Sequence, residues 1–213
     1  MGPFRVYLFD VDGTLLDSAQ DICEALRETL RGHPVDGFNE ALVKRYIGYH
    51  LLEFFRAVLP TYSEQQHWEL VQRYREIYPT RQHRLTRVYP GVPEMLAELP
   101  GRKGTATTKS TATVRAVLEQ FGLLRYFDHP QGTDGFPAKP APDVIHAALA
   151  ALGARPEECL LVGDSPADME AGRRAGVRLC AVRYGYGDPA VLARFEPEFW
   201  ISHPRELLSV VPV

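Results

Sequence analysis

The chain has 213 residues, of which 45% are hydrophobic and 24% are charged, and its formal net charge at pH 7 is −3. This length is enough for one large domain or two small ones, and the near-neutral charge argues against nucleic acid as a partner. No apolar run approaches the ~20 residues that a membrane-spanning helix needs, so we expect a cytoplasmic protein without membrane or nucleic-acid partners. The three cysteines are far apart and are expected to be packing residues.

The first part of the sequence predicts one strand followed by a long helical region. Residues 5–9 form an apolar run that ends at two aspartates, as in a buried strand. Ser18 and Asp21 have the spacing of a capping box, and so do Ser63 and Gln66. We expect helices that start near residues 18, 39, 51 and 63, and no strand between residues 17 and 84.

From residue 89 onward, short predicted strands alternate with helices. The strands are expected at 103–107, 159–162 and 178–182, with a poor candidate at 129–133. The helices are expected at 94–99, 111–121, 142–152, 166–175, 188–195 and 204–211. This alternation is typical of the α/β class with a doubly wound, mostly parallel, Rossmann-like sheet. We expect an α/β core domain of residues 1–16 and 85–213, with a helical-bundle domain of residues 17–84 inserted into it.

The first strand ends in Asp10-Val11-Asp12-Gly13, which places two carboxylates on one side of an extended chain. Two acids so close repel each other unless a cation lies between them or they share a proton. Hard oxygen ligands favour Mg²⁺. An ordinary Asp-Gly turn is the alternative that this stretch alone leaves open.

Later strand ends bring further polar groups to the same edge of the predicted sheet. Thr107 follows the second strand, Asp164 and Asp168 follow the strand at 159–162, and Lys139 precedes a helix. Each has an ordinary explanation, such as a helix cap for Asp164, a first-turn acid for Asp168 or a solvated loop for Lys139. Their coincidence at successive strand ends favours a joint chemical role.

These residues resemble the four motifs of the haloacid dehalogenase-like phosphatases, in their usual order, and the resemblance spans nearly the whole chain. The motifs are Asp10-Val11-Asp12-Gly13-Thr14, Thr107, Lys139, and Gly163-Asp164 with Asp168. The helical insertion resembles that family's cap of the first type. The phosphoglycolate phosphatase branch is the most similar, although Thr108 stands where that branch usually has asparagine.

The resemblance implies a Mg²⁺-dependent phosphatase that hydrolyses a small phosphorylated metabolite through an aspartyl-phosphate. Asp10 is then the nucleophile and Asp12 the general acid and base. The metal is expected at Asp10, the Asp12 carbonyl and Asp164, with Asp168 orienting the ligands. Phosphate and substrate contacts are expected from Gly13, Thr14, Thr107, Thr108 and Lys139.

Other activities within and outside the family remain open at this point. A dehalogenase of this type lacks the second aspartate, so Asp12 argues for phosphate chemistry. The alternatives are a sugar-phosphate mutase similar to β-phosphoglucomutase, a pyrophosphatase or a nucleotidase; Thr14-Leu15 favours a hydrolase over a mutase. A receiver-like phospho-acceptor module is the non-enzyme alternative, which the chain length disfavours.

Substrate specificity is expected to depend on the first loop of the cap, Gly48-Tyr49-His50. Arg45 or Arg56 could bind a substrate carboxylate, although a solvated helix face is the better explanation for both. The sequence leaves a monomer and a homodimer equally open.

Overall fold

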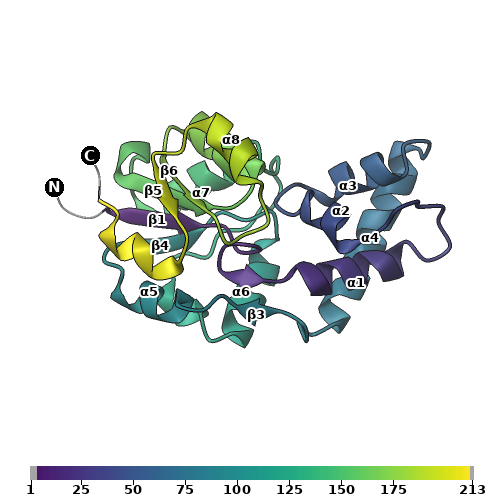
Figure 1. The fold of residues 1–213 in the computed structure, drawn as a ribbon, viewed down its shortest axis with the longest axis horizontal. Coiled ribbons are helices and arrows are strands. Elements are labelled where there is room, and N and C mark those ends of the chain that lie inside the picture. Colours follow the sequence, from purple (N-terminus) through teal and green to yellow (C-terminus); the bar gives the residue numbers. More distant parts are fainter. Residues whose placement is uncertain (1–3, 212–213) are drawn as a thin grey trace.

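A computed structural model describes residues 4–211, so the outermost residues of the expected core domain, 1–3 and 212–213, lie outside the described part. The larger lobe is built on a five-stranded parallel sheet with the order β4-β1-β5-β6-β7 (Figure 1). The strands are β1 (Val6–Phe9), β4 (Arg102–Thr105), β5 (Cys159–Gly163), β6 (Arg178–Val182) and β7 (Phe199–Ile201). The predicted α/β class is confirmed.

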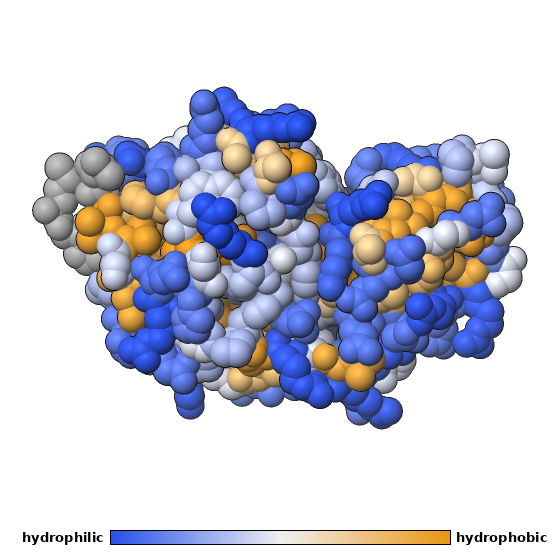
Figure 2. All heavy atoms as spheres, viewed as in Figure 1, coloured by the Kyte–Doolittle hydropathy of each residue, from blue (hydrophilic) through white to orange (hydrophobic). Residues whose placement is uncertain are grey.

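A smaller helical lobe lies beside the sheet, and Figure 2 shows a notch where the two lobes meet. It contains α1 (Ala19–Thr29), α2 (Glu40–Lys44), α3 (Leu51–Val58) and α4 (Glu64–Thr80). These helices pack around a hydrophobic cluster of their own, with Leu26, Phe55 and Val71 among its most buried members. None of the helices in residues 4–211 is long and apolar enough to cross a bilayer.

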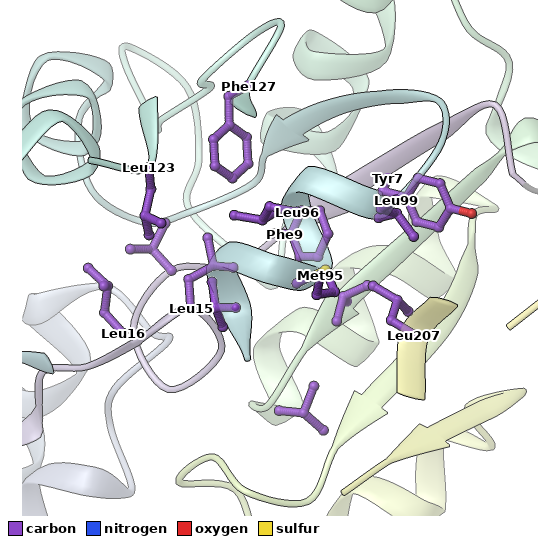
Figure 3. Packing of buried hydrophobic residues seen from close by; sticks show 14 of the residues in the cluster. Tyr7, Phe9, Leu15, Leu16, Met95, Leu96, Leu99, Leu123, Phe127 and Leu207 are labelled. Carbon is purple, nitrogen blue, oxygen red and sulfur yellow. The ribbon is translucent and has the colours of Figure 1, made fainter. Parts of the chain in front are cut away.

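Helices cover both faces of the sheet, so its central strands are apolar on both sides. In β1, Tyr7 and Phe9 belong to one hydrophobic cluster, and Val6 and Leu8 belong to the cluster on the opposite face. The first cluster includes residues of α5 (Val92–Glu98) and α6 (Thr111–Gln120), as Figure 3 shows for α5. The second includes residues of α7 (Asp143–Leu152) and α8 (Pro166–Ala175). The two aspartates follow β1 at its carboxyl end.

Two short antiparallel strands, β2 (Leu16–Asp17) and β3 (Arg87–Val88), connect the lobes. Leu16 pairs with Val88, and Asp17 pairs with Arg87. The expectation of helices alone from residue 17 is therefore wrong at Asp17. A two-residue strand is too short to leave a periodic pattern in the sequence.

The predicted helix starts are correct at α2 and α4 and wrong in detail at α1. Asn39 accepts a hydrogen bond from the Leu42 amide at 2.9 Å, and Ser63 and Gln66 form the predicted capping box. Ser18 does precede α1, but its hydroxyl makes no capping bond. Asp21 instead accepts hydrogen bonds from the Leu85 amide and the Thr86 hydroxyl, each at 2.8 Å.

Several predicted elements after residue 90 differ from the structure. Residues 129–133 form no strand, because only a single bridge joins His129 to Gly104. The segment 204–211 is a 3-10 helix, Pro204–Ser209, and the segment 188–195 divides into α9 (Pro189–Leu192) and a 3-10 turn. Further 3-10 turns are Leu124–Tyr126 and Pro156–Glu158. The three cysteines are buried and free, as expected.

Candidate active site

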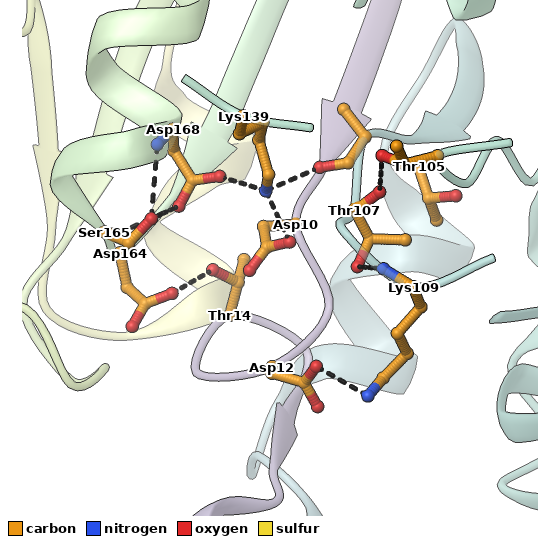
Figure 4. Close-up of polar contacts among 12 residues, drawn as sticks. Asp10, Asp12, Thr14, Thr105, Thr107, Lys109, Lys139, Asp164, Ser165 and Asp168 are labelled. Carbon is orange, nitrogen blue, oxygen red and sulfur yellow. Dashed lines mark hydrogen bonds and ion pairs between the residues drawn. The ribbon is translucent and has the colours of Figure 1, made fainter. Parts of the chain in front are cut away.

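The carboxyl ends of three neighbouring strands deliver polar side chains to one edge of the sheet (Figure 4). Asp10 and Asp12 follow β1, Thr107 follows β4, and Asp164 follows β5. The chain passes from one side of β1 to the other between β4 and β5, so these ends flank the switch point where doubly wound sheets bind ligands. Asp10, Thr107 and Asp164 are each at most 2% exposed.

Lys139 is a buried cation that joins two of the predicted site acids. Its Nζ donates to Asp10 Oδ1 at 2.8 Å, to Asp168 Oδ1 at 2.5 Å and to the Ala106 carbonyl at 2.8 Å. Burial alone lowers the pKa of Lys139, but Asp10 and Asp168 outweigh it and the net effect raises the pKa. Because an ammonium has three donors, every N–H of Lys139 has a partner and its position is fixed.

Asp164 is oriented by the turn after β1 and by the loop after β6. The Thr14 hydroxyl donates to its Oδ1 at 3.1 Å, and the Tyr186 amide donates to its Oδ2 at 2.8 Å. Gly13 has φ +88°, and a Cβ at this position would collide with the Asp164 carboxylate. The Gly13 amide donates to the Leu16 carbonyl at 2.8 Å. In this structure Gly13 and Thr14 therefore shape the turn and hold Asp164. The phosphate contacts predicted for them stay a prediction.

Asp168 lies in the first turn of α8. The amide and the hydroxyl of Ser165 donate to Asp168 Oδ2 at 2.9 and 2.6 Å, and the Asp168 amide donates to the Ser165 hydroxyl. This capping box makes Ser165 the N-cap, so helix capping does not explain the presence of Asp164. The other oxygen of Asp168, Oδ1, accepts from Lys139.

The three buried acids have the composition of a divalent-cation site. Carboxylate oxygens of Asp10, Asp164 and Asp168 lie within 4.8 Å of one another. Asp10 Oδ2 is buried and has no hydrogen-bond partner among the described residues. Three carboxylates against the single ammonium of Lys139 leave two negative charges when all are ionised. The arrangement fits a hard divalent ion with oxygen ligands, and Asp168 is close enough to contribute directly, whereas the sequence predicted a supporting position for it.

The pKa values of these acids reflect the uncompensated charge. Burial raises the pKa of Asp10 to about 7, against the opposing effect of Lys139, and the nearby Asp168 and Asp12 add to the rise. Burial, followed by the charges of Asp168 and Asp10, raises the pKa of Asp164 well above its usual range. Both shifts have the sign expected of carboxylates that require a cation to ionise fully.

Asp12 lies apart from the other acids and is held by two residues that the sequence did not single out. The Ser18 hydroxyl donates to its Oδ1 at 2.5 Å, and Lys109 Nζ lies 2.8 Å from its Oδ2. Asp12 as a whole residue is 8% exposed, and it lines a cavity of about 650 Å³ between the lobes. Asp12 thus faces the cavity, while Asp10 faces Asp164 and Asp168.

Thr107 lies at the margin of this arrangement. Its hydroxyl accepts a long hydrogen bond, 3.4 Å, from the Lys109 amide, and its carbonyl accepts from the Thr133 hydroxyl at 2.9 Å. Thr108 is half-buried and lines the cavity. The Thr107 hydroxyl makes no direct contact with Asp10 among the hydrogen bonds of the described residues, so its predicted role at the phosphate stays a prediction.

The sequence profile of the haloacid dehalogenase-like hydrolase family matches residues 7–182. A phosphoglycolate phosphatase from Aquifex aeolicus is 34% identical over 97% of this chain and 96% of its own length. A pyrophosphatase PpaX from Listeria welshimeri is 33% identical over 99% of this chain and 97% of its own length. A haloacid dehalogenase-like hydrolase from Streptococcus pneumoniae superposes with a TM-score of 0.88 at 29% identity, covering 97% of both chains.

The chain belongs to the haloacid dehalogenase-like hydrolases. This membership confirms the predicted family and enzyme class, a phosphatase. It also excludes the receiver-like module, since the matched span includes the whole helical insertion of this hydrolase.

The cavity of this hydrolase is lined by the loop that the sequence assigned to specificity, Gly48-Tyr49-His50. Gly48 has φ +99°, and a Cβ there would collide with Ser165 on the sheet lobe, so the loop closely approaches the start of α8. The two arginines for which a solvated helix face was the preferred explanation are both exposed. Arg56 is exposed and paired with Glu53 and Glu64, and Arg45 is exposed and does not line the cavity.

Three contacts at the site were not predicted: those of Ser18, Lys109 and Tyr186. The Tyr186 hydroxyl accepts from the Ser18 and Ala19 amides at 2.7 and 2.9 Å and donates to Asp17 at 2.8 Å. It thereby satisfies two amides at the start of α1, where the Ser18 hydroxyl binds Asp12 and makes no capping bond. For Lys109 there was a signal, since it lies two residues after the motif threonine.

Proposed function

We propose that this hydrolase is a Mg²⁺-dependent phosphatase of small phosphate monoesters that works through a phosphoryl group carried on Asp10. The observation that carries the proposal is the buried, unpartnered Oδ2 of Asp10, which lies beside Lys139 and within 4.8 Å of Asp164. An unpaired buried carboxylate oxygen is costly to maintain. Such an oxygen is expected in a metal ligand or a nucleophile, where a bound ion or the substrate supplies the missing contact.

In the first half-reaction an oxygen of Asp10 attacks phosphorus, and the bond between phosphorus and the ester oxygen breaks. The electron pair leaves with the ester oxygen, which takes a proton from Asp12. In the second half-reaction Asp12 removes a proton from water, whose oxygen attacks the same phosphorus, releasing phosphate and restoring Asp10. The hydrogen bond from Ser18 and the ion pair with Lys109 keep Asp12 in place for both transfers.

Asp10, Asp164 and Asp168, with the Asp12 carbonyl, would hold the Mg²⁺. When bound, the ion supplies positive charge that allows an anionic carboxylate to approach an anionic phosphoryl group. Lys139 adds a fixed positive charge at Asp10. Thr107 and neighbouring backbone amides are proposed to hold the phosphoryl oxygens.

We further propose that residues 17–84 act as a cap domain over a core of residues 1–16 and 85–213. The separate hydrophobic cluster of α1 to α4 and the two-strand connection through β2 and β3 support this division. A cap at this position would exclude bulk water from the aspartyl-phosphate. A closed cap would admit only a small metabolite, and the free, buried cysteines support a reducing compartment such as the cytoplasm.

The first candidate substrate is 2-phosphoglycolate, and inorganic pyrophosphate is the second. Relatives named for each substrate align over nearly the full chain at 34% and 33% identity, so sequence similarity does not separate them. Both candidates are small and carry a second anionic group close to the scissile bond.

Phosphate release from a panel of phosphate esters tests the proposal. We expect Mg²⁺-dependent release from 2-phosphoglycolate or pyrophosphate, and slower release from p-nitrophenyl phosphate. Absence of turnover on every ester, with several divalent metals and folded protein, would contradict the proposed function. Equal and slow rates across the panel would contradict the substrate assignment only.

Metal binding is expected to stabilise the protein more at high pH than at low pH. A carboxyl whose pKa is raised by folding favours the fold below its ordinary pKa near ~4, and this contribution is lost as the pH rises through the folded value, about 7 for Asp10. The metal-free protein should therefore lose stability over this window, and Mg²⁺ should restore it. At saturating Mg²⁺ we expect a rise in Tm of about 5–10 °C at pH 8 and little change at pH 5. Thermal unfolding with Mg²⁺ or with EDTA measures this difference, and equal shifts at both pH values would contradict it.

A further inference from the structure

Lys109 is a nearly buried cation at the boundary between the two lobes. It follows β4, yet its side chain reaches the helical lobe, where Nζ lies 3.3 Å from the Tyr78 hydroxyl and 4.8 Å from the centre of the Tyr78 ring. Its side chain is only 10% exposed, and what remains exposed lines the cavity between the lobes. A lysine in this environment needs compensating charge.

The compensation available from the protein is incomplete. Among the described residues, Lys109 Nζ has two side-chain partners, Asp12 and Tyr78. An ammonium has three donors, so one remains for a ligand in the cavity. Asp12 is itself shared, because its other oxygen accepts from Ser18.

The other charged groups that line the cavity differ from Lys109 in charge or in burial. Asp134 accepts hydrogen bonds from the Thr111 amide at 3.1 and 3.2 Å, which ties it to the start of α6. Arg75 belongs to α4 and is exposed. Burial, followed by the charge of Arg75, lowers the pKa of His50, which therefore adds little positive charge near neutral pH. Lys109 is the buried cation closest to Asp12 in the part of the chain that the structure describes.

We propose that Lys109 binds a second anionic group on the leaving group of the substrate and thereby selects phosphate esters or anhydrides that carry such a group next to the leaving oxygen. The inference rests on the proposed function, because it takes Asp12 as the residue that protonates the ester oxygen. Lys109 Nζ lies 2.8 Å from Asp12 Oδ2. When Asp12 protonates the leaving oxygen of the substrate, Nζ therefore reaches only groups that lie one or two bonds beyond that leaving oxygen. A carboxylate on the adjacent carbon and the second phosphate of pyrophosphate both meet this requirement.

The competing explanation is purely positional: Lys109 could hold Asp12 in place and never touch the substrate. The two explanations differ in their dependence on the substrate. A positional lysine affects every ester that needs Asp12 as an acid, whereas a binding lysine discriminates between charged and neutral leaving groups of the same shape.

The experiment compares kcat/KM for 2-phosphoglycolate and for its neutral amide, 2-phosphoglycolamide, in the native enzyme and in Lys109→Met. We expect the native enzyme to prefer the charged substrate by about 10²-fold, the size of a lost charged hydrogen bond. In Lys109→Met this preference should fall to a few-fold, mainly through a higher KM for 2-phosphoglycolate. Lys109→Arg, which retains the charge, should recover part of the preference.

Arg56→Met is the matched control, since it removes a cation of the helical lobe that is paired at the surface. It should leave the preference unchanged. Inorganic pyrophosphate provides a second arm: a larger loss in Lys109→Met for pyrophosphate than for 2-phosphoglycolate identifies phosphate as the group bound, and the reverse identifies carboxylate.

Two results would overturn the inference: equal loss on the charged and neutral esters in Lys109→Met, or no charge preference in the native enzyme. If Lys109→Met does not fold, as judged by circular dichroism, Lys109→Gln provides the same comparison. Failure of the proposed function is a different result, namely no phosphate release by the native enzyme from any of these esters or from p-nitrophenyl phosphate.

Discussion

Replacement of Asp10 by asparagine should abolish turnover. The amide is a poor nucleophile and cannot offer an anionic oxygen to a metal, so both proposed functions of Asp10 are lost together. Removing a residue that acts at the reacting atom lowers kcat by at least about 10⁴-fold in comparable enzymes. Steady-state phosphate release from the best substrate of the panel, with native protein and Asp10→Asn at equal concentration, measures the loss.

The same variant should be as stable as the native protein, or more stable, in EDTA at pH 8. Asparagine removes one of three buried carboxylates that share a single ammonium, and the raised pKa of Asp10 indicates that its ionised form is disfavoured in the fold. Asp36→Asn, at an exposed position, serves as the control for the chemical change alone. Activity retained in Asp10→Asn, or activity lost only because the variant unfolds, would contradict the account.

Replacement of Lys139 by methionine should cost both stability and activity. Methionine fills similar space but leaves Asp10 and Asp168 without the buried ammonium that joins them. Breaking a buried charge pair in this way typically costs about 3–5 kcal/mol. The loss should be smaller at pH 5 than at pH 8, because protonation of Asp10 and Asp164, whose pKa values are raised, relieves the repulsion.

Urea unfolding in EDTA at the two pH values measures this effect. The double variant Lys139→Met with Asp168→Asn is the internal control, since it removes one of the orphaned charges and should recover part of the lost stability. Equal destabilisation at both pH values, or additive effects in the double variant, would show that Lys139 contributes only packing.

The sequence predicted most of the fold because its signals are local. The β1 strand, with apolar residues for both faces of the sheet, and α8, between Ser165 and Gly176, lie where the sequence placed them. Predictions failed where structure depends on distant partners. The β2 strand exists only because Leu16 and Asp17 pair with residues about 70 positions later.

Predictions for the site also succeeded where the signal is local and failed where a contact depends on distant residues. Asp10 and Asp164 were predicted together because strand ends in a doubly wound sheet converge, and Lys139 was predicted because it precedes a helix at a position that matches the family's motif order. The capping bond predicted for Ser18 is absent, since its hydroxyl donates to Asp12 and the amides of Ser18 and Ala19 donate to Tyr186, which lies 168 residues beyond Ser18. Lys109 was given no role from the sequence, because only the folded chain brings it to Asp12 and Tyr78.

Trapping of the phosphorylated enzyme tests the central claim, that Asp10 carries the phosphoryl group. In Asp12→Asn the residue that activates water is absent, while p-nitrophenyl phosphate has a leaving group that departs without a proton. The account predicts a burst of p-nitrophenol equal to the enzyme concentration and, after acid quench and digestion, a phosphoryl group on the peptide that contains Asp10. A burst with the phosphoryl group on another peptide would contradict the claim. So would phosphorylation that persists when Asp10 is also replaced by asparagine.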